Sequence, residues 1–116
     1  MILINKTNNF IISENLEVAN SYFKRLKGLM FTKKLPEKNA LKLIPCNQIH
    51  TFFMNYSIDV LYLDSDNNVI FCEENLKPGK IGARVKNALS VIELPNGKIK
   101  KSNIKIGDSV IIQNNK

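Results

Sequence analysis

Two stretches rich in strand-forming residues, close together in the chain, constrain its fold most strongly. They read IHTFFM (residues 49–54) and IDVLYLD (residues 58–64), and Asn55-Tyr56-Ser57 separates them. Both contain many β-branched and aromatic residues, and both are apolar at consecutive positions, which is typical of strands covered on both faces. The sequence therefore predicts a sheet whose central strands are buried on both sides.

Further strand-like runs surround this pair and are separated by turn residues. They cover residues 1–5, 10–19 (one strand or two short ones), 40–44, 69–75, 89–100 with a tight turn at 95–97, and 104–112 with a bend at 107–108. The segment 76–88 contains Pro78, Gly79 and Gly82 and is expected to be a loop. Many short strands predict a mainly β fold, a compact sandwich or jelly-roll-like barrel.

One short helix is expected near the N-terminus. Asn20 or Ser21 can cap it, and Gly28 is suited to end it. Apolar residues between Tyr22 and Met30 recur at spacings of three and four, so one side of this segment is apolar. We expect Leu29, Met30 and Phe31 to close one end of the sandwich.

The length of 116 residues predicts a single domain, residues 1–116. No apolar run reaches the roughly 18 residues of a membrane-spanning helix. The first ten residues show no secretory leader pattern, which predicts a cytoplasmic location. Cys46 and Cys72 are too few for a disulfide framework and are expected to be reduced thiols.

The net charge of +7 raises the question of nucleic-acid binding. The lysines are spread along the whole chain, and the aromatic residues lie mostly in apolar runs rather than among basic residues, as a stacking surface would require. This distribution argues against specific nucleic-acid binding. No glycine-rich phosphate loop or dinucleotide fingerprint is present, so no cofactor is expected.

Six motifs resemble, in order, those of a widespread prokaryotic family, domain of unknown function 192. They are RLKGLMF, IHTFFM, IDVLYLD, LKP, VIELPNG and IKIGD, and the resemblance runs from about residue 14 to residue 113. It implies a mostly β sandwich or jelly-roll fold with a short N-terminal helix, and a family without an established reaction. The characteristic positions that it implies here are Arg25, Gly28, Leu29, Met30, Cys46, His50, Thr51, Met54, Asp59, Asp64, Pro78, Glu93, Gly97, Gly107 and Asp108.

The segment from Cys46 to Asp59 holds the candidates for chemistry. A Cys46–His50 pair requires a turn that folds the thiol back, because four residues of extended strand span about 13 Å. If residues 55–57 form a three-residue hairpin loop, Asp59 faces away from His50. If the loop has two residues, Asp59 shares the face of His50. Each of these residues also has a purely structural interpretation. Cys46 would be a semi-buried thiol, His50 a core imidazole, and Asp59 a carboxylate bound to backbone amides or an arginine.

The leading functional hypothesis is a cleft that binds a small ligand or a protein partner. Its expected residues are Arg25, His50, Thr51, Met54 and Asp59. The alternatives are a hydrolase-like enzyme that uses Cys46 and His50, and a structural or assembly module. Cys46, His50 and a carboxylate could offer three zinc ligands, but a single histidine and no close cysteine pair favour no metal. Whether Glu93 stabilises a turn or faces the same cleft as Asp59 stays open.

Overall fold

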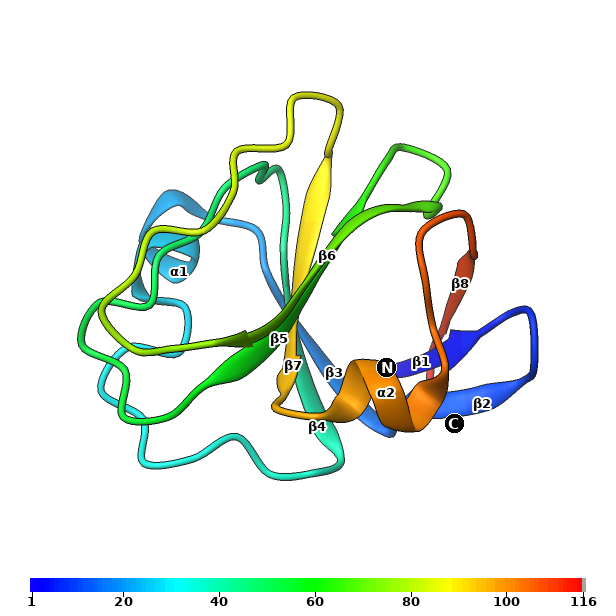
Figure 1. Cartoon of the computed structure of the whole chain (residues 1–116), viewed down its shortest axis with the longest axis horizontal. Coiled ribbons are helices and arrows are strands. Elements are labelled where there is room, and N and C mark those ends of the chain that lie inside the picture. The colour runs from blue at the N-terminus through cyan, green and yellow to red at the C-terminus, as the bar shows by residue number, and fades with distance from the viewer. Residues whose placement is uncertain (116) are drawn as a thin grey trace.

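The computed structural model describes residues 1–115, which fold into two packed sheets and two short helices (Figure 1). The strands are β1 (Ile2–Asn5), β2 (Phe10–Ser13), β3 (Asn15–Ala19), β4 (Asn39–Leu43), β5 (Ile58–Leu63), β6 (Val69–Leu76), β7 (Ser90–Pro95) and β8 (Val110–Gln113), and the helices are α1 (Tyr22–Lys27) and α2 (Lys98–Ser102). One sheet has the order β2-β1-β8 and the other β3-β4-β7-β5-β6. Strands β3 and β4 are parallel, whereas the other neighbours are antiparallel. The predicted mainly β sandwich class is confirmed, with two open sheets.

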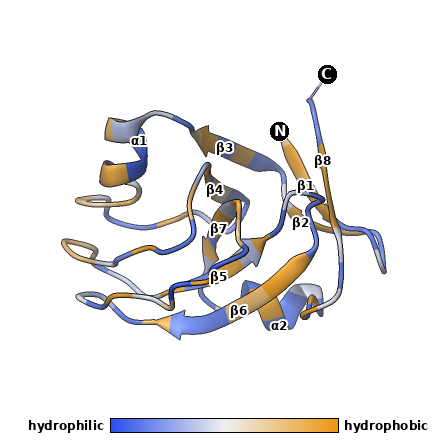
Figure 2. Ribbon diagram, turned by 90° about the horizontal axis from the view of Figure 1, so that it is seen from above, coloured by the Kyte–Doolittle hydropathy of each residue, from blue (hydrophilic) through white to orange (hydrophobic). Residues whose placement is uncertain are grey.

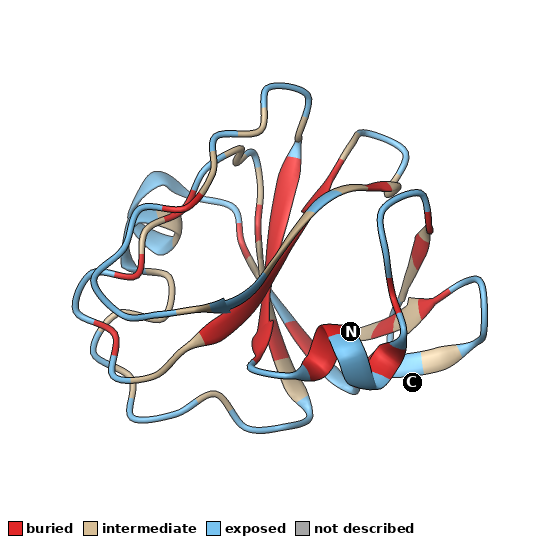
Figure 3. Ribbon diagram, in the orientation of Figure 1, coloured by how far each residue is buried: buried red, intermediate tan, exposed pale blue. Residues whose placement is uncertain are grey.

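The five-stranded sheet is covered on both faces, as its central strands predicted. Every residue of β5 and β7 is buried (Figure 3). On one face, Leu61 and Ile92 pack in a core with residues of the three-stranded sheet and α2. On the other face, Val60 and Val91 belong to a second cluster that is closed by loop residues. A hydrophobic core on each side explains why these strands are apolar at consecutive positions.

The predicted strand over IHTFFM is wrong, because this run lies in a long loop over residues 44–57. The loop is hydrogen-bonded to the loop 77–89 by backbone contacts such as Thr51 N to Lys80 O (2.8 Å) and Gly82 N to Ile49 O (2.9 Å). Its buried residues Ile49, Thr51 and Met54 do not alternate, and Phe53 has a positive φ of 61°. Apolar composition alone does not distinguish a strand from a loop that packs its side chains onto a sheet.

The second strand expected after the turn at 95–97 is also absent, because residues 98–102 form α2. Gly97, at a φ of 90°, turns the chain, and the backbone N–H of Ile99 donates to Asp59 Oδ2 (2.9 Å). Ile99 and Ser102 then face the core, and the buried Lys98 forms an ion pair with Glu37 (2.7 Å). The alternating Lys-Ile-Lys pattern predicted a strand, but the tertiary contacts of Ile99 and Asp59 favour a helical turn.

Helix α1 is confirmed, with Ser21 as its N-cap and Gly28 at its C-terminal end. The Ser21 side chain accepts a hydrogen bond from Lys24 N at 3.2 Å. Its apolar residues are only partly used for packing, since Phe23 is 78% exposed and Leu26 is 49% exposed. Neither α1 nor α2 is long and apolar enough to cross a membrane.

Candidate functional site

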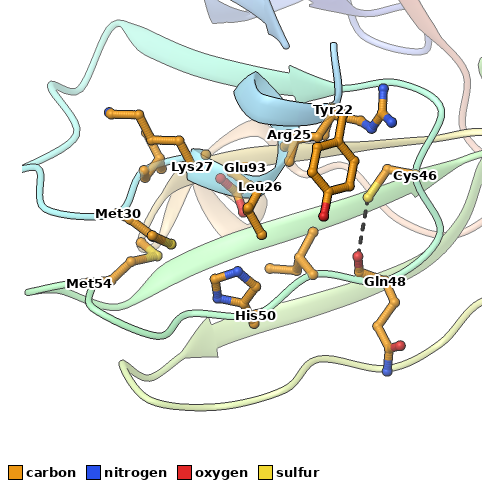
Figure 4. A pocket seen from close by; sticks show the side chains of 14 residues that line it. Tyr22, Arg25, Leu26, Lys27, Met30, Cys46, Gln48, His50, Met54 and Glu93 are labelled. Carbon is orange, nitrogen blue, oxygen red and sulfur yellow. Dashed lines mark hydrogen bonds between the residues drawn. The ribbon is translucent and has the colours of Figure 1, made fainter. Parts of the chain in front are cut away.

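A cavity of about 260 Å³ lies between α1 and the loop 44–57, on the outer face of the five-stranded sheet (Figure 4). Helix α1 and the turn after it form one wall, the loop forms the opposite wall, and β4 and β7 contribute the floor. Its lining residues are Tyr22, Arg25, Leu26, Lys27, Gly28, Leu29, Met30, Leu43, Cys46, Gln48, Ile49, His50, Met54 and Glu93. Most of the lining side chains are apolar, and a few polar groups converge among them, as is usual for small-molecule sites.

Glu93 is the polar group at the floor of the cavity. In β7 it pairs with Val60 on one side and Leu41 on the other, and both neighbours belong to the outer apolar cluster. Its side chain is buried, with 2% relative exposure, and Oε1 has no hydrogen-bond partner among residues 1–115. This burial raises the pKa of Glu93 to about 8. At neutral pH the carboxyl group is therefore mostly protonated, and it can both donate and accept a hydrogen bond.

Gly28, at the end of α1, lies next to Glu93. Gly28 adopts φ 46° and ψ −124°, a conformation that glycine tolerates far better than other residues. A Cβ at this position would lie 3.7 Å from Glu93 Oε1, so the backbone itself forms the wall next to the carboxyl group. One turn earlier, Arg25 is half-buried and its Nη1 donates to Ile44 O at 3.5 Å. The guanidinium group thus ties α1 to the end of β4 and lines the cavity.

His50 lies on the loop wall, with its ring directed along the cavity (Figure 4). Its Nδ1 accepts a hydrogen bond from Phe52 N (3.1 Å), and the ring stacks on Phe52 with centroids 5.1 Å apart. An accepting Nδ1 places the proton of the neutral imidazole on Nε2. His50 can therefore offer an N–H donor to a molecule in the cavity.

Cys46 also lines the cavity, but its thiol is not activated. Its Sγ donates to Gln48 O at 3.2 Å, and burial raises its pKa above the ordinary value of 9.0. Burial is the largest influence on this pKa; a backbone hydrogen bond at Gln48 lowers it by less, and the charges of Glu93 and Arg25 have smaller effects of opposite sign. Because the thiolate is the nucleophilic form, a raised pKa leaves Cys46 weakly reactive at neutral pH.

Asp59 does not reach this cavity, which corrects the expectation that it shares a hollow with His50. In β5 it pairs with Leu94 of β7, so its side chain lies on the inner face, opposite to Glu93. Its carboxylate accepts hydrogen bonds from Asn75 N and Ile99 N, both at 2.9 Å. Asp59 is thus an acceptor for backbone amides, which is the structural role considered for it, and it borders a separate hollow beside α2.

Thr51 is likewise outside the cavity lining, although it lies between lining residues. It is fully buried, and its Oγ1 donates to Lys77 O (2.5 Å) and accepts from Lys80 N (2.9 Å). These bonds fasten the loop 44–57 to the loop 77–89. Of the five residues predicted for a binding cleft, the structure brings together Arg25, His50 and Met54, and it separates Thr51 and Asp59 from them.

Glu93 was not among the predicted cleft residues, although a signal for it exists in the sequence. It is the single charged residue within the apolar strand SVIELP. Burying a carboxyl group there costs free energy, which marks the residue as unusual. The strand alone does not tell which face such a residue occupies. Across residues 1–115, no group of three or more His, Cys, Asp or Glu side chains is arranged to hold a metal ion.

Relatives of this chain match nearly its whole length. The family model DUF192, described as "Uncharacterized ACR, COG1430", matches residues 3–112. The chain is 34% identical over 117 residues to a UPF0127 protein of Thermococcus sibiricus, and this alignment covers 94% of this chain and 73% of that protein. It is 32% identical over 114 residues to a UPF0127 protein of Pyrococcus horikoshii, with 94% and 96% covered. The structure also resembles the crystal structure of a protein of unknown function from Novosphingobium aromaticivorans, with a TM-score of 0.83 at 20% identity. The superposition covers 96% of this chain and 82% of that one, and it shows a similar fold.

Proposed function

Because this chain belongs to the DUF192 family of uncharacterised proteins, as its ordered motifs predicted, we propose its function from its own cavity. The protein binds a small, largely apolar molecule, one polar group of which hydrogen-bonds to Glu93. The observation that carries this proposal is the buried Glu93 Oε1 at the cavity floor without a hydrogen-bond partner among residues 1–115. An unsatisfied buried polar atom costs about 1–3 kcal/mol, and such costs persist mainly at functional sites.

The walls favour an apolar body for this ligand. Leu26, Leu29, Leu43 and Ile49 present aliphatic carbon, and Met30 and Met54 lie side by side at one end (Figure 4). Methionine side chains are flexible and polarisable, so they adapt to ligands of different shape. The volume of about 260 Å³ is just below the roughly 300 Å³ at which sites for drug-sized molecules begin. We therefore expect a small metabolite-like molecule rather than a large cofactor.

The chemistry of Glu93 selects the polar group. A protonated carboxyl group donates through its hydroxyl and accepts through its carbonyl, so it pairs best with a group that does the same. Carboxamide, carboxyl and hydroxyl groups meet this requirement. Arg25 and Lys27 also line the cavity, and their positive charges disfavour a cationic ligand.

A thermal-shift screen of metabolites against the purified protein tests the proposal, followed by mapping of each hit through amide chemical shifts. We expect shifts confined to α1, the loop 44–57 and β7. Leu26→Trp places a large side chain in the lining and should abolish the thermal shift. Phe23→Trp is the matched control, because Phe23 lies on the same helix but outside the lining. Hits that perturb α2 and β6 instead, or that survive Leu26→Trp, would contradict this site.

A hydrolase-like enzyme is the second candidate, because Cys46 and His50 line the same cavity. This function requires a thiolate at Cys46, and the raised pKa of that thiol opposes it. Alkylation by iodoacetamide at neutral pH separates the two candidates. A slow rate, comparable to that of an ordinary buried thiol, supports binding without covalent chemistry, whereas rapid modification of Cys46 that His50→Gln slows would support the enzyme.

The cytoplasmic location and the single-domain organisation expected from the sequence stay predictions.

A further inference from the structure

Three turns expose large apolar side chains at one end of the molecule. They are residues 31–34, 52–53 and 77–81, and we call their exposed faces the tip surface. Phe31 and Phe53 are 68% and 67% exposed, both have positive φ angles of 65° and 61°, and their rings stack with centroids 5.4 Å apart. Ile81 is 65% exposed and pairs with His50 through an isolated antiparallel bridge. Figures 1 and 2 place these turns at the end opposite β1, β2 and β8, and Figure 2 shows their hydrophobic stretches.

Backbone contacts hold the three turns together as one surface. Phe31 N donates to Phe53 O at 2.9 Å, and Gly79 N donates to Thr51 O at 2.9 Å. The neighbours of the exposed rings point inwards, since Met30 precedes Phe31, Met54 follows Phe53, and both methionines line the cavity. The turns that carry Phe31 and Phe53 therefore each combine a methionine in the cavity lining with a ring that projects outwards.

The charged side chains carried by the loops at this end are all basic, and the carboxylate of Glu73, which adjoins the loop 77–89 from β6, is hydrogen-bonded to Tyr62 OH and Ala83 N. Residues 21–35, 44–57 and 77–89 contain no aspartate or glutamate, although the chain has ten. Four exposed lysines, Lys33, Lys34, Lys77 and Lys80, lie within the tip surface. Exposed apolar groups on a soluble protein commonly mark an interaction site, and a basic border favours an anionic partner.

We propose that the tip surface docks on an anionic membrane surface, with the Phe31 and Phe53 rings at headgroup depth and the lysines next to lipid phosphates. Phenylalanine rings bury favourably at the boundary between headgroups and acyl chains. Lysine side chains reach polar headgroups while their methylene stems stay in apolar contact. Basic residues near the surface add attraction to anionic lipid. The inference is independent of any ligand in the cavity.

A single-stranded nucleic acid fits this surface less well. Stacking platforms need aromatic faces along a groove that follows the strand, whereas Phe31 and Phe53 already stack on each other. Ile81 and the aliphatic part of the turn add apolar surface that bases do not use. The four lysines supply charge without the bidentate geometry of arginine.

Co-sedimentation with vesicles tests the proposal. The whole protein is mixed with phosphatidylcholine vesicles, with or without phosphatidylglycerol. We expect binding to the anionic vesicles alone, and weaker binding as salt rises, because salt screens the lysines. Phe31→Ala with Phe53→Ala should lower the partition coefficient by about tenfold. Lys33→Glu with Lys34→Glu should lower it by at least about twentyfold.

Matched variants at the opposite end provide the controls. Ile11 and Ile106 are 51% and 59% exposed, so Ile11→Ala with Ile106→Ala removes comparable apolar surface. Lys6→Glu with Lys105→Glu reverses the same number of charges. Both controls should bind vesicles as the unaltered protein does, with circular dichroism confirming the fold of every variant. Absence of binding to anionic vesicles at low salt, equal losses in the control variants, or binding of the tip surface to a single-stranded oligonucleotide instead of vesicles would overturn the proposal.

Discussion

Replacing Glu93 by glutamine should stabilise the protein, increasingly as the pH rises. Glu93 has an ordinary pKa of 4.5 when unfolded and about 8 when buried in β7. At a pH between these two pKa values, the carboxyl group ionises in the unfolded chain but stays protonated in the folded one. Ionisation therefore stabilises only the unfolded state in this range. The free energy of unfolding therefore falls as the pH rises from about 4.5 to about 8, and the loss is complete above pH 8.

The size of this loss follows from the two pKa values. They differ by about 3.5 pH units, and each unit corresponds to about 1.4 kcal/mol, so the loss approaches about 5 kcal/mol above pH 8. At pH 7 it amounts to about 3 kcal/mol. Glutamine is nearly isosteric, stays neutral, and keeps a donor and an acceptor at the cavity floor. Glu93→Gln should thus equal the unaltered protein near pH 4 and exceed it by about 3 kcal/mol at pH 7.

Urea unfolding at several pH values measures this difference. The chain has no tryptophan, so far-UV circular dichroism is the suitable signal. Glu17→Gln serves as the control, because Glu17 is exposed on β3 and its removal should leave the pH dependence unchanged. Parallel pH profiles for Glu93→Gln and the unaltered protein would refute the reasoning, since they would mean that the Glu93 carboxyl group titrates normally in the folded state.

Three further substitutions test the structural roles assigned above, each by urea unfolding. Asp59→Asn replaces an acceptor of two backbone amides by a group that can satisfy only one, and should cost about 3 kcal/mol; a cost below about 1 kcal/mol would contradict the role. Thr51→Val leaves Lys80 N without its acceptor and should cost about 2 kcal/mol, whereas a neutral effect would show that the two loops are held otherwise. Gly28→Ala should cost about 1–3 kcal/mol from its positive φ alone, because the added Cβ meets no atom closer than 3.7 Å; unchanged stability would mean that the turn relaxes freely.

The sequence alone determined those features that depend on a few neighbouring residues. Ser21 and Gly28 set the limits of α1, since a capping hydroxyl and a glycine act within one helical turn. The β character of β5 and β7, and their burial on both faces, follow from consecutive apolar side chains. The same kind of reasoning failed for IHTFFM, because an apolar loop that packs on a sheet has the composition of a strand.

Only the tertiary structure decided which side chains form the site. Asp59 and Glu93 are both acidic residues in buried strands, yet the register that pairs Asp59 with Leu94 and Val60 with Glu93 sends their carboxyl groups to opposite faces. One carboxylate then meets the backbone amides of Asn75 and Ile99, while the other reaches the cavity beside Gly28. Successive residues of a strand point to opposite sides, so a shift of one position exchanges these environments. That register is fixed by pairing between residues far apart in the chain, such as Asp59 and Leu94, which no local pattern contains.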